Sequence, residues 1–293
     1  MPCYHPVQAW YSAQKNSSGK RSLIFQASGG FGSPIRIPCG GCLGCRLERS
    51  RQWAFRCKHE ASLYADNAFI TLTYSDKTLP DNRSLRHRDF QLFMKRLRFV
   101  RPNQKIGFYM CGEYGETTVR PHYHAILFNT RFEDQRFYKW STNGDPIYKS
   151  EELNRLWKLG DCLVGAVTFE SAAYVARYIL KKITGDLAPA HYAGRAPEYA
   201  QMSRASGIGK GWFEKYKSDC YPSDFLVHDG KKAKVPRYYD KQLPEEELAT
   251  YKTSRKETAR LTWKNSTPSR LRVRETVKKS QMALIKRDFK NDY

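Results

Sequence analysis

The segment from His122 to Phe128 most narrowly constrains how this chain can fold. It reads His-Tyr-His-Ala-Ile-Leu-Phe, so two histidines one residue apart enter an apolar run. Such a run favours a buried strand, and side chains alternate between the two faces of a strand. His122 and His124 are therefore expected on one face, with Tyr123 on the other. Two imidazoles on one sheet face predict a metal site.

The overall charge of the chain points to a polyanionic partner. Its 293 residues include 51 lysines and arginines against 29 acids, a formal net charge of +22. An excess of this size repels itself in a compact protein, and nucleic acid is the partner that neutralises it. The sequence holds no run of about eighteen apolar residues, and residues 1–5 lack the basic-then-apolar layout of a signal peptide. We therefore expect a cytoplasmic protein that does not contact membranes.

Periodic patterns predict alternating strands and helices over residues 69–182. Strands are expected at residues 69–74, 105–113, 122–128 and 162–169. Helices are expected after three serines in N-cap positions, Ser84, Ser150 and Ser171, the last helix reaching Lys182. The first helix has apolar residues at the i, i+3, i+4, i+7 spacing of a helix that packs on a sheet: Phe90, Phe93, Met94 and Leu97.

This order of elements predicts the α+β class, with an antiparallel sheet in the split β-α-β, or ferredoxin-like, arrangement. Two helices would cover one face of the sheet, and the helix after the last strand would cross the other face. A glycine-containing turn joins Glu113 to His122, so their strands are expected to pair as neighbours. Glu113 would then converge with His122 and His124. The alternative is that Glu113 is a solvated acid in the turn.

Three segments, taken together, resemble the motifs of a known enzyme family. They are Phe69-Ile-Thr-Leu-Thr, Pro121-His-Tyr-His and Tyr174-Val-Ala-Arg-Tyr-Ile-Leu-Lys-Lys. In order and spacing they resemble the motifs of rolling-circle replication initiators, the histidine-hydrophobic-histidine (HUH) endonucleases with two tyrosines. The start Met-Pro-Cys-Tyr-His-Pro and the segment Cys39-Gly-Gly-Cys-Leu-Gly-Cys-Arg are similar to replication initiation proteins of the gokushovirus branch of the microviruses.

The resemblance implies a metal-dependent DNA endonuclease and strand transferase. Tyr174 and Tyr178, which would share one helix face, would attack the DNA backbone in turn and form a 5′-phosphotyrosine intermediate. Lys181 would stabilise negative charge, with Lys182 as the alternative, and the two histidines with Glu113 would hold Mg²⁺ or Mn²⁺. The implied partners are a specific single-stranded origin, supercoiled viral DNA, and the helicase and DNA polymerase of a bacterial host cell.

The region after residue 185 is basic and lacks the motif of an ATP-driven motor. Residues 206–212 form a basic glycine-rich segment without the Walker pattern of an ATP-binding loop, so unwinding is assigned to the host helicase. Residues 251–293 carry 13 lysines and arginines against 4 acids, and they are expected to bind the DNA backbone unless they form only a solvated helix face. Candidates for stacking on unpaired bases are Trp212, Tyr216, Tyr238 and Tyr239.

Cysteines predict a second metal site. Cys39, Cys42 and Cys45 recur with two residues between them, a spacing typical of zinc ligands. An iron–sulfur cluster is disfavoured because the cysteine run does not continue after Cys45. Buried or free thiols are the alternative to a metal site. The fourth zinc ligand stays open among Cys3, His5, Cys57 and His59.

We therefore expect three regions: a cysteine-rich segment and helix in residues 1–65, an endonuclease core in 66–185 and a basic DNA-binding region in 186–293. The predicted function is a replication initiator that nicks a single-stranded origin and religates the circle. A conjugative relaxase or a single-strand transposase would use the same chemistry. The alternative of another class is a noncatalytic zinc-containing nucleic-acid-binding protein, whose histidines and tyrosines would belong to the core.

Overall fold

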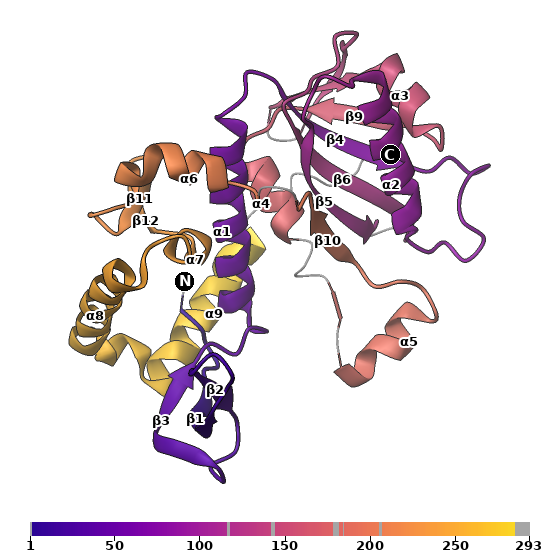
Figure 1. Cartoon of the computed structure of the whole chain (residues 1–293). Coiled ribbons are helices and arrows are strands. Elements are labelled where there is room, and N and C mark those ends of the chain that lie inside the picture. The colour runs from indigo at the N-terminus through magenta and orange to yellow at the C-terminus, as the bar shows by residue number, and fades with distance from the viewer. Residues whose placement is uncertain are drawn as a thin grey trace. The chain divides into compact units, whose positions relative to one another are not determined.

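The computed structural model describes residues 2–115, 118–141, 144–177, 182–183, 185–204 and 207–284 (Figure 1). Their contacts form two compact units. The smaller unit joins the described residues up to 48 to those from 254 onward, and the larger unit lies between residues 49 and 253. Over the described part of the chain, no helix combines the length and the hydropathy needed to cross a bilayer.

Among the described residues, the larger unit is built on an antiparallel sheet of seven strands in the order β10-β5-β6-β4-β9-β8-β7. The strands are β4 (Asn67–Thr73), β5 (Gly107–Tyr114), β6 (Pro121–Phe128), β7 (Arg136–Trp140), β8 (Pro146–Lys149), β9 (Cys162–Gly165) and β10 (Tyr199–Met202). With α2 (His87–Val100) and α3 (Glu151–Trp157), the chain order is β4-α2-β5-β6-α3-β9 around the β7-β8 hairpin. The spatial order β5-β6-β4-β9 is the split β-α-β arrangement, so the predicted α+β fold class is confirmed.

One face of this sheet packs against α2 and α3 (Figure 1). The apolar residues of α2 that have helical spacing are all buried, namely Phe90, Phe93, Met94 and Leu97. They belong to one core with Leu72 of β4 and Tyr123 of β6, which point to the same face. Trp157, at the end of α3, donates its indole N–H to the Thr73 carbonyl oxygen at 2.9 Å. This bond ties the end of α3 to the end of β4.

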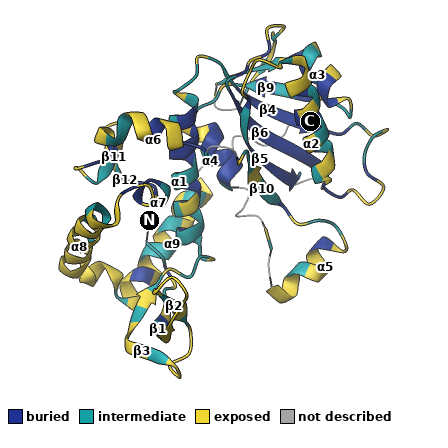
Figure 2. Ribbon diagram, in the orientation of Figure 1, coloured by how far each residue is buried: buried dark blue, intermediate teal, exposed yellow. Residues whose placement is uncertain are grey.

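The opposite face is covered by α1 (Leu43–Ala61) and α4 (Phe169–Arg177). Ala54 and Cys57 of α1 and Val175 of α4 are fully buried in one core with Ile126 and Phe128 of β6. The central strands are therefore covered on both sides, and Figure 2 shows them buried along their length. Side chains that alternate along β6 all reach the interior of the unit, the histidines included.

The predicted serine caps hold at α3 but not at α2. Ser150 caps α3, because its hydroxyl oxygen accepts a hydrogen bond from the Leu153 N–H at 3.1 Å. The α2 helix begins at His87 instead of directly after Ser84. The Ser84 hydroxyl accepts the Ala196 N–H at 2.9 Å, so it anchors a distant loop instead.

The start of α4 is set by a reciprocal pair of hydrogen bonds. The Thr168 hydroxyl accepts the Ser171 N–H at 3.1 Å, and the Ser171 hydroxyl accepts the Thr168 N–H at 2.8 Å. This arrangement is a capping box with Thr168 in the N-cap position. The helix therefore begins at Phe169, earlier than predicted, and the preceding strand ends at Gly165.

Aromatic rings form a further core in the larger unit. The elements of the larger unit not yet described are α5 (Ala188–Tyr192), α6 (Lys210–Tyr216), β11 (Phe225–His228), β12 (Lys231–Lys234), α7 (Arg237–Asp240) and the start of α8 (Glu245–Leu261), with 3-10 turns at Gly185–Leu187 and Lys217–Asp219. His59 of α1 stacks on Trp212 at 3.5 Å, and burial lowers the pKa of His59 to about 3. Trp212 and Tyr239 are 7% and 0% exposed. The prediction that these two rings stack on unpaired bases is wrong, because both are core residues.

The smaller unit contains a three-stranded antiparallel sheet that sequence patterns do not predict. Its strands are β1 (Val7–Lys15), β2 (Arg21–Ile24) and β3 (Gly30–Ile37), in the order β2-β1-β3. Most of their side chains are exposed, so the sequence lacks the alternation of a half-buried strand. The start of α1, the end of α8, a 3-10 turn at Trp263–Ser266 and α9 (Pro268–Leu284) complete the unit.

Gly160 lies where the chain between α3 and β9 passes the end of β4. Its φ is +148°, and a Cβ there would lie 2.3 Å from the Ser75 nitrogen and 2.4 Å from the Thr73 carbonyl oxygen. These backbone atoms cannot move without disturbing the hydrogen bonds that join Thr73 and Ser75 to Asp161 and Leu159. We expect Gly160→Ala to lower the free energy of unfolding by about 2–3 kcal/mol, measured by urea denaturation with tryptophan fluorescence.

Gly194→Ala is the matched control for this prediction. Gly194 also has a positive φ, +82°, but a Cβ there would have no atom within 4 Å. The control variant should lose only about 1 kcal/mol, the cost of the backbone conformation alone. Equal losses in the two variants would contradict the argument, because contact with β4 would then contribute nothing.

Candidate functional site

The two histidines and Glu113 meet on the face of the sheet that α1 and α4 cover. In the register of β5 and β6, Glu113 lies directly opposite His122, and His124 follows on the same face. The Oε1 atom of Glu113 lies 2.7 Å from Nε2 of His122 and 3.1 Å from Nε2 of His124. The structure therefore brings all three side chains together, with their ligand atoms within 4.8 Å of one another.

Burial strengthens the electrostatic interactions within this cluster. Glu113 is 1% exposed, and each histidine is 2% exposed. Burial by itself would raise the pKa of the Glu113 carboxyl, but hydrogen bonds from His122 and His124 outweigh it and lower the pKa to about 2. Glu113 is therefore a carboxylate at neutral pH. One carboxylate and two imidazoles form a ligand set suited to a divalent transition metal.

Each histidine ring is also held from its other side. Nδ1 of His122 donates to the Arg120 carbonyl oxygen at 3.1 Å, and Nδ1 of His124 lies 3.0 Å from the Thr71 hydroxyl oxygen. These contacts direct both Nε2 atoms toward Glu113. Neighbouring ligands of an ion bound at about 2.1 Å lie about 3 Å apart. The observed separations of 2.7 and 3.1 Å are close to this value, so the residues fit a divalent cation.

The contact of Thr71 with His124 is not visible in the sequence pattern. Alternation along β4 places Thr71 on the same face as Phe69, but the pattern does not say which strand lies beside β4. The structure pairs β4 with β6, so that Thr71 lies opposite His124. This contact depends on the register between two strands that are distant in sequence, which the sequence pattern does not reveal.

Tyr174 contacts this cluster from α4. Its ring stands nearly perpendicular to that of His124, with the ring centroids 5.0 Å apart, and the residue is 9% exposed. The Tyr174 ring also makes an edge contact with Phe69 of β4, at 6.4 Å between centroids. A phenol therefore lies beside the imidazole pair. Tyr178 and Lys181 lie outside the described residues.

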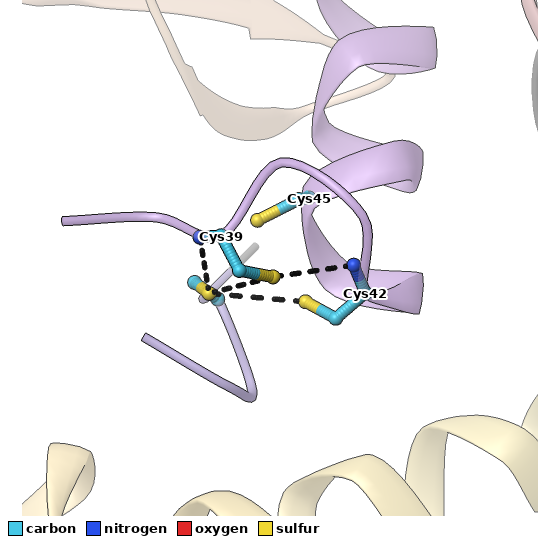
Figure 3. Close-up of side chains that lie close together, drawn as sticks. Cys39, Cys42 and Cys45 are labelled. Atoms are coloured by element: carbon cyan, nitrogen blue, oxygen red, sulfur yellow. Dashed lines mark hydrogen bonds between the residues drawn. The ribbon is translucent and has the colours of Figure 1, made fainter. Parts of the chain in front are cut away.

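A second group of potential metal ligands lies in the smaller unit. The Sγ atoms of Cys3, Cys39, Cys42 and Cys45 lie within 4.8 Å of one another (Figure 3). Sγ of Cys3 is 3.6 Å from Sγ of Cys39 and 3.8 Å from Sγ of Cys42. In a tetrahedral zinc site, bonds of about 2.3 Å place the sulfur atoms about 3.8 Å apart. All four are free cysteines, and their spacing fits a tetrahedral ion.

Backbone N–H groups around these sulfur atoms favour the thiolate form. The amides of Tyr4, Cys39 and Cys42 each donate to a sulfur atom at 3.3 Å. Burial would raise the pKa of Cys42, but backbone hydrogen bonds outweigh it and lower the pKa to about 6, whereas burial raises the pKa of Cys3 and Cys45. Gly44 lets the N-terminal segment approach, because a Cβ there would lie 2.0 Å from the Pro2 carbonyl oxygen. The thiolate is the form of cysteine that binds metals.

The other candidates for a fourth ligand have different partners. His5 Nε2 lies 2.7 Å from a carboxylate oxygen of Glu275. Cys57 is fully buried in the core between α1 and the large sheet. His59 stacks on Trp212 in the aromatic core. Among the described residues, Cys3 is the residue that completes the group of three regularly spaced cysteines.

Comparisons with known proteins agree with this organisation. Residues 67–183, from β4 through α4, match the family model for replication-associated protein ORF2/G2P. The chain is 34% identical over 250 residues to replication-associated protein VP4 of Bdellovibrio phage phiMH2K. The matched region covers 82% of this chain and 76% of the relative. No solved structure matches the chain.

Two further relatives come from other phages. Replication-associated protein ORF2 of Spiroplasma virus 4 is 33% identical over 222 residues, covering 72% of this chain and 68% of the relative. Replication-associated protein ORF4 of Chlamydia phage 1 is 31% identical over 212 residues, covering 69% of this chain and 52% of the relative. The chain therefore belongs to the family of phage replication-associated proteins, which confirms its resemblance to the microvirus initiators.

Proposed function

We propose that this protein initiates rolling-circle replication of a small circular viral genome. It cuts a specific single-stranded origin and later religates the circle. The observation that carries the proposal is the contact of the Tyr174 phenol with His124, whose imidazole shares the carboxylate of Glu113 with His122. Metal-assisted phosphoryl transfer requires at least a nucleophile close to a group of metal ligands.

His122, His124 and Glu113 would hold the cation through Nε2, Nε2 and Oε1. When bound, Mg²⁺ or Mn²⁺ supplies Lewis-acid stabilisation of the charge on the non-bridging phosphate oxygens. The two nitrogen ligands favour Mn²⁺, whereas Mg²⁺ prefers oxygen ligands. Thr71 and the Arg120 carbonyl keep the imidazoles in the orientation that ligation requires.

The chemical step belongs to the tyrosines. Tyr174 Oη attacks the phosphorus atom and forms a phosphotyrosine with the 5′ end of the strand downstream of the cut, while the bond from phosphorus to the 3′ oxygen breaks. The phenol loses its proton, and the departing 3′ oxygen gains one and becomes a free 3′-OH. The phosphotyrosine bond conserves the energy needed for resealing. Lys181 would stabilise the negative charge that develops in this step.

The second tyrosine completes the cycle. A host DNA polymerase would extend the free 3′-OH while a host helicase separates the supercoiled duplex in the bacterial cytoplasm. Tyr178 would then cut the regenerated junction. The newly released 3′-OH attacks the first phosphotyrosine, which closes the circle and restores the Tyr174 phenol. A conjugative relaxase or transposase would share this chemistry, and the replication-associated relatives favour the initiator.

A covalent DNA adduct is the first predicted outcome. Wild-type protein, mixed with Mn²⁺ and labelled single strands that tile the genome encoding it, should form an adduct that survives a denaturing gel. The double variant Tyr174→Phe, Tyr178→Phe should form none, because both attacking hydroxyls are gone. Tyr138→Phe is the control, since Tyr138 is 49% exposed on β7, away from the cluster. Mass spectrometry of the attached peptide should identify Tyr174 or Tyr178.

The outcomes separate the candidate functions. An adduct in the double variant would place the nucleophile elsewhere and remove the proposed mechanism. No adduct with any strand or cation in the wild type would favour a noncatalytic zinc-containing nucleic-acid-binding protein. A cut on plasmid transfer DNA, and none on the viral strand, would instead support a relaxase.

Orientation of His124 by Thr71 gives a second prediction. Thr71→Val removes the hydroxyl that contacts Nδ1, and we expect Mn²⁺ affinity, measured by isothermal titration calorimetry, to fall about 10- to 100-fold. Thr130→Val is the matched control, because Thr130 is buried like Thr71 but its hydroxyl contacts Arg101. Equal affinities in Thr71→Val and wild type would show that the Thr71 hydroxyl does not orient the ligand.

We also propose that the four clustered cysteines hold a structural zinc ion. Purified protein should contain about one zinc per chain by plasma mass spectrometry, in keeping with four thiolate ligands. The double variant Cys3→Ser, Cys42→Ser should lose this zinc and melt at a lower temperature, because metal binding contributes folding free energy. Cys220→Ser, at a fully buried cysteine of the larger unit, should keep its zinc. Full zinc content in the double variant would contradict the assignment.

A further inference from the structure

The three-stranded sheet of the smaller unit exposes a row of apolar side chains across all its strands. Tyr11 of β1 lies opposite both Leu23 of β2 and Phe31 of β3. Directly opposed residues lie on the same face of a sheet, so the three side chains adjoin. They are 45%, 43% and 57% exposed, respectively. Contiguous exposed apolar residues mark an interaction surface more often than scattered ones do. We call these three residues the Tyr11 row.

Cations accompany the Tyr11 row. The guanidinium carbon of Arg21 lies 4.1 Å from the centre of the Phe31 ring, and Arg21 Nη1 donates to the Ser12 carbonyl oxygen at 2.9 Å. Lys15 pairs with Arg21 in the register of β1 and β2. The guanidinium is thus fixed over the aromatic ring by its backbone contact and by cation–π attraction.

Basic residues far outnumber acidic residues in the smaller unit. Residues 1–47 contain five lysines and arginines and no aspartate or glutamate. In residues 1–48 and 254–285 together, 14 lysines and arginines accompany 3 acids. This excess is half of the net charge of +22, although it is carried by far fewer than half of the 293 residues.

The combination of exposed rings and an excess of cations over acids indicates the kind of partner. A second copy of this chain would bring two positively charged surfaces together, and no acid within residues 1–47 would offset the repulsion. Double-stranded DNA offers phosphates but keeps the faces of its bases stacked inside. Single-stranded DNA offers both phosphates for the cations and free base faces for the rings.

We propose that the Tyr11 row is a base-stacking platform for single-stranded DNA, with Lys15 and Arg21 contacting its phosphates. This inference rests on the proposed function, because the strand it binds is the single-stranded DNA that the larger unit cuts. The platform assigns strand binding to the smaller unit and leaves strand cutting to Tyr174 and the metal-ligand cluster.

Fluorescence anisotropy with a labelled 20-residue oligothymidine tests this platform. The full chain is used without added Mg²⁺ or Mn²⁺, so that binding is measured apart from cutting. We expect Tyr11→Ala, Phe31→Ala to weaken binding about 10- to 100-fold, because two stacking surfaces are lost. The matched control is Phe99→Ala, Phe137→Ala, which removes rings that are 85% and 54% exposed in the larger unit and should bind like wild type.

A second variant distinguishes the loss of stacking from a general loss of folding. Tyr11→Trp, Phe31→Trp keeps a flat ring at both positions, so it should bind the oligothymidine at least as well as wild type, with quenching of its indole fluorescence. Equal binding by the alanine variant and wild type would overturn the platform. A wild-type dimer that dissociates in the alanine variant, detected by light scattering, would also overturn it and assign the row to a second copy.

The adduct assay keeps the two proposals distinct. If wild type forms no adduct with any strand but the alanine variant still loses oligothymidine binding, the platform stands and the cutting mechanism fails. If wild type forms the adduct and the alanine variant binds oligothymidine normally, the cutting mechanism stands and the platform fails.

Discussion

The pairing of β6 with β5 on one side and β4 on the other is the constraint on which the site depends. This register places His122 opposite Glu113 and His124 opposite Thr71, so backbone hydrogen bonding fixes the placement of the candidate ligands and of the hydroxyl that contacts one of them. A shift of one residue in β6 would turn both histidines toward α2 and α3. The apolar alternation of Tyr123, Ala125 and Leu127 on that face prevents such a shift, because it would bring imidazoles into the hydrophobic core.

Burial of the cluster has two opposing consequences for the proposed chemistry. In a low-dielectric interior the Glu113 carboxylate attracts a cation or an imidazolium more strongly than it would at the surface. The same burial excludes the substrate, because Glu113, His122 and His124 are at most 2% exposed. A DNA phosphate can therefore reach these atoms only when the side chains that cover them move. Tyr174, which packs on His124 from α4, belongs to that cover, so admitting the phosphate and positioning the proposed nucleophile would involve the same contact.

Sequence periodicity predicts the buried part of this fold and fails for the exposed part. The central strands and α2 have one or two apolar faces, and these faces produce the spacings that identify them. The β1-β2-β3 sheet has few buried side chains, so its strands leave no such trace. Cysteine spacing likewise predicts three of the four clustered thiols. Cys3 is separated from Cys39 by the whole sheet, and only folding brings the two together.

The exposed sheet also explains why the smaller unit would need a metal ion. Among its described residues, the buried apolar side chains are Tyr4, Ala9 and Leu271. A core of this size provides little of the free energy that offsets the conformational entropy of folding. A metal held by Cys3 and the 39–45 loop would supply that free energy locally, because a preformed ligand set does not exist in the unfolded chain. Stability obtained from such a metal in place of a core would leave the rings of the Tyr11 row exposed for the proposed contact with DNA.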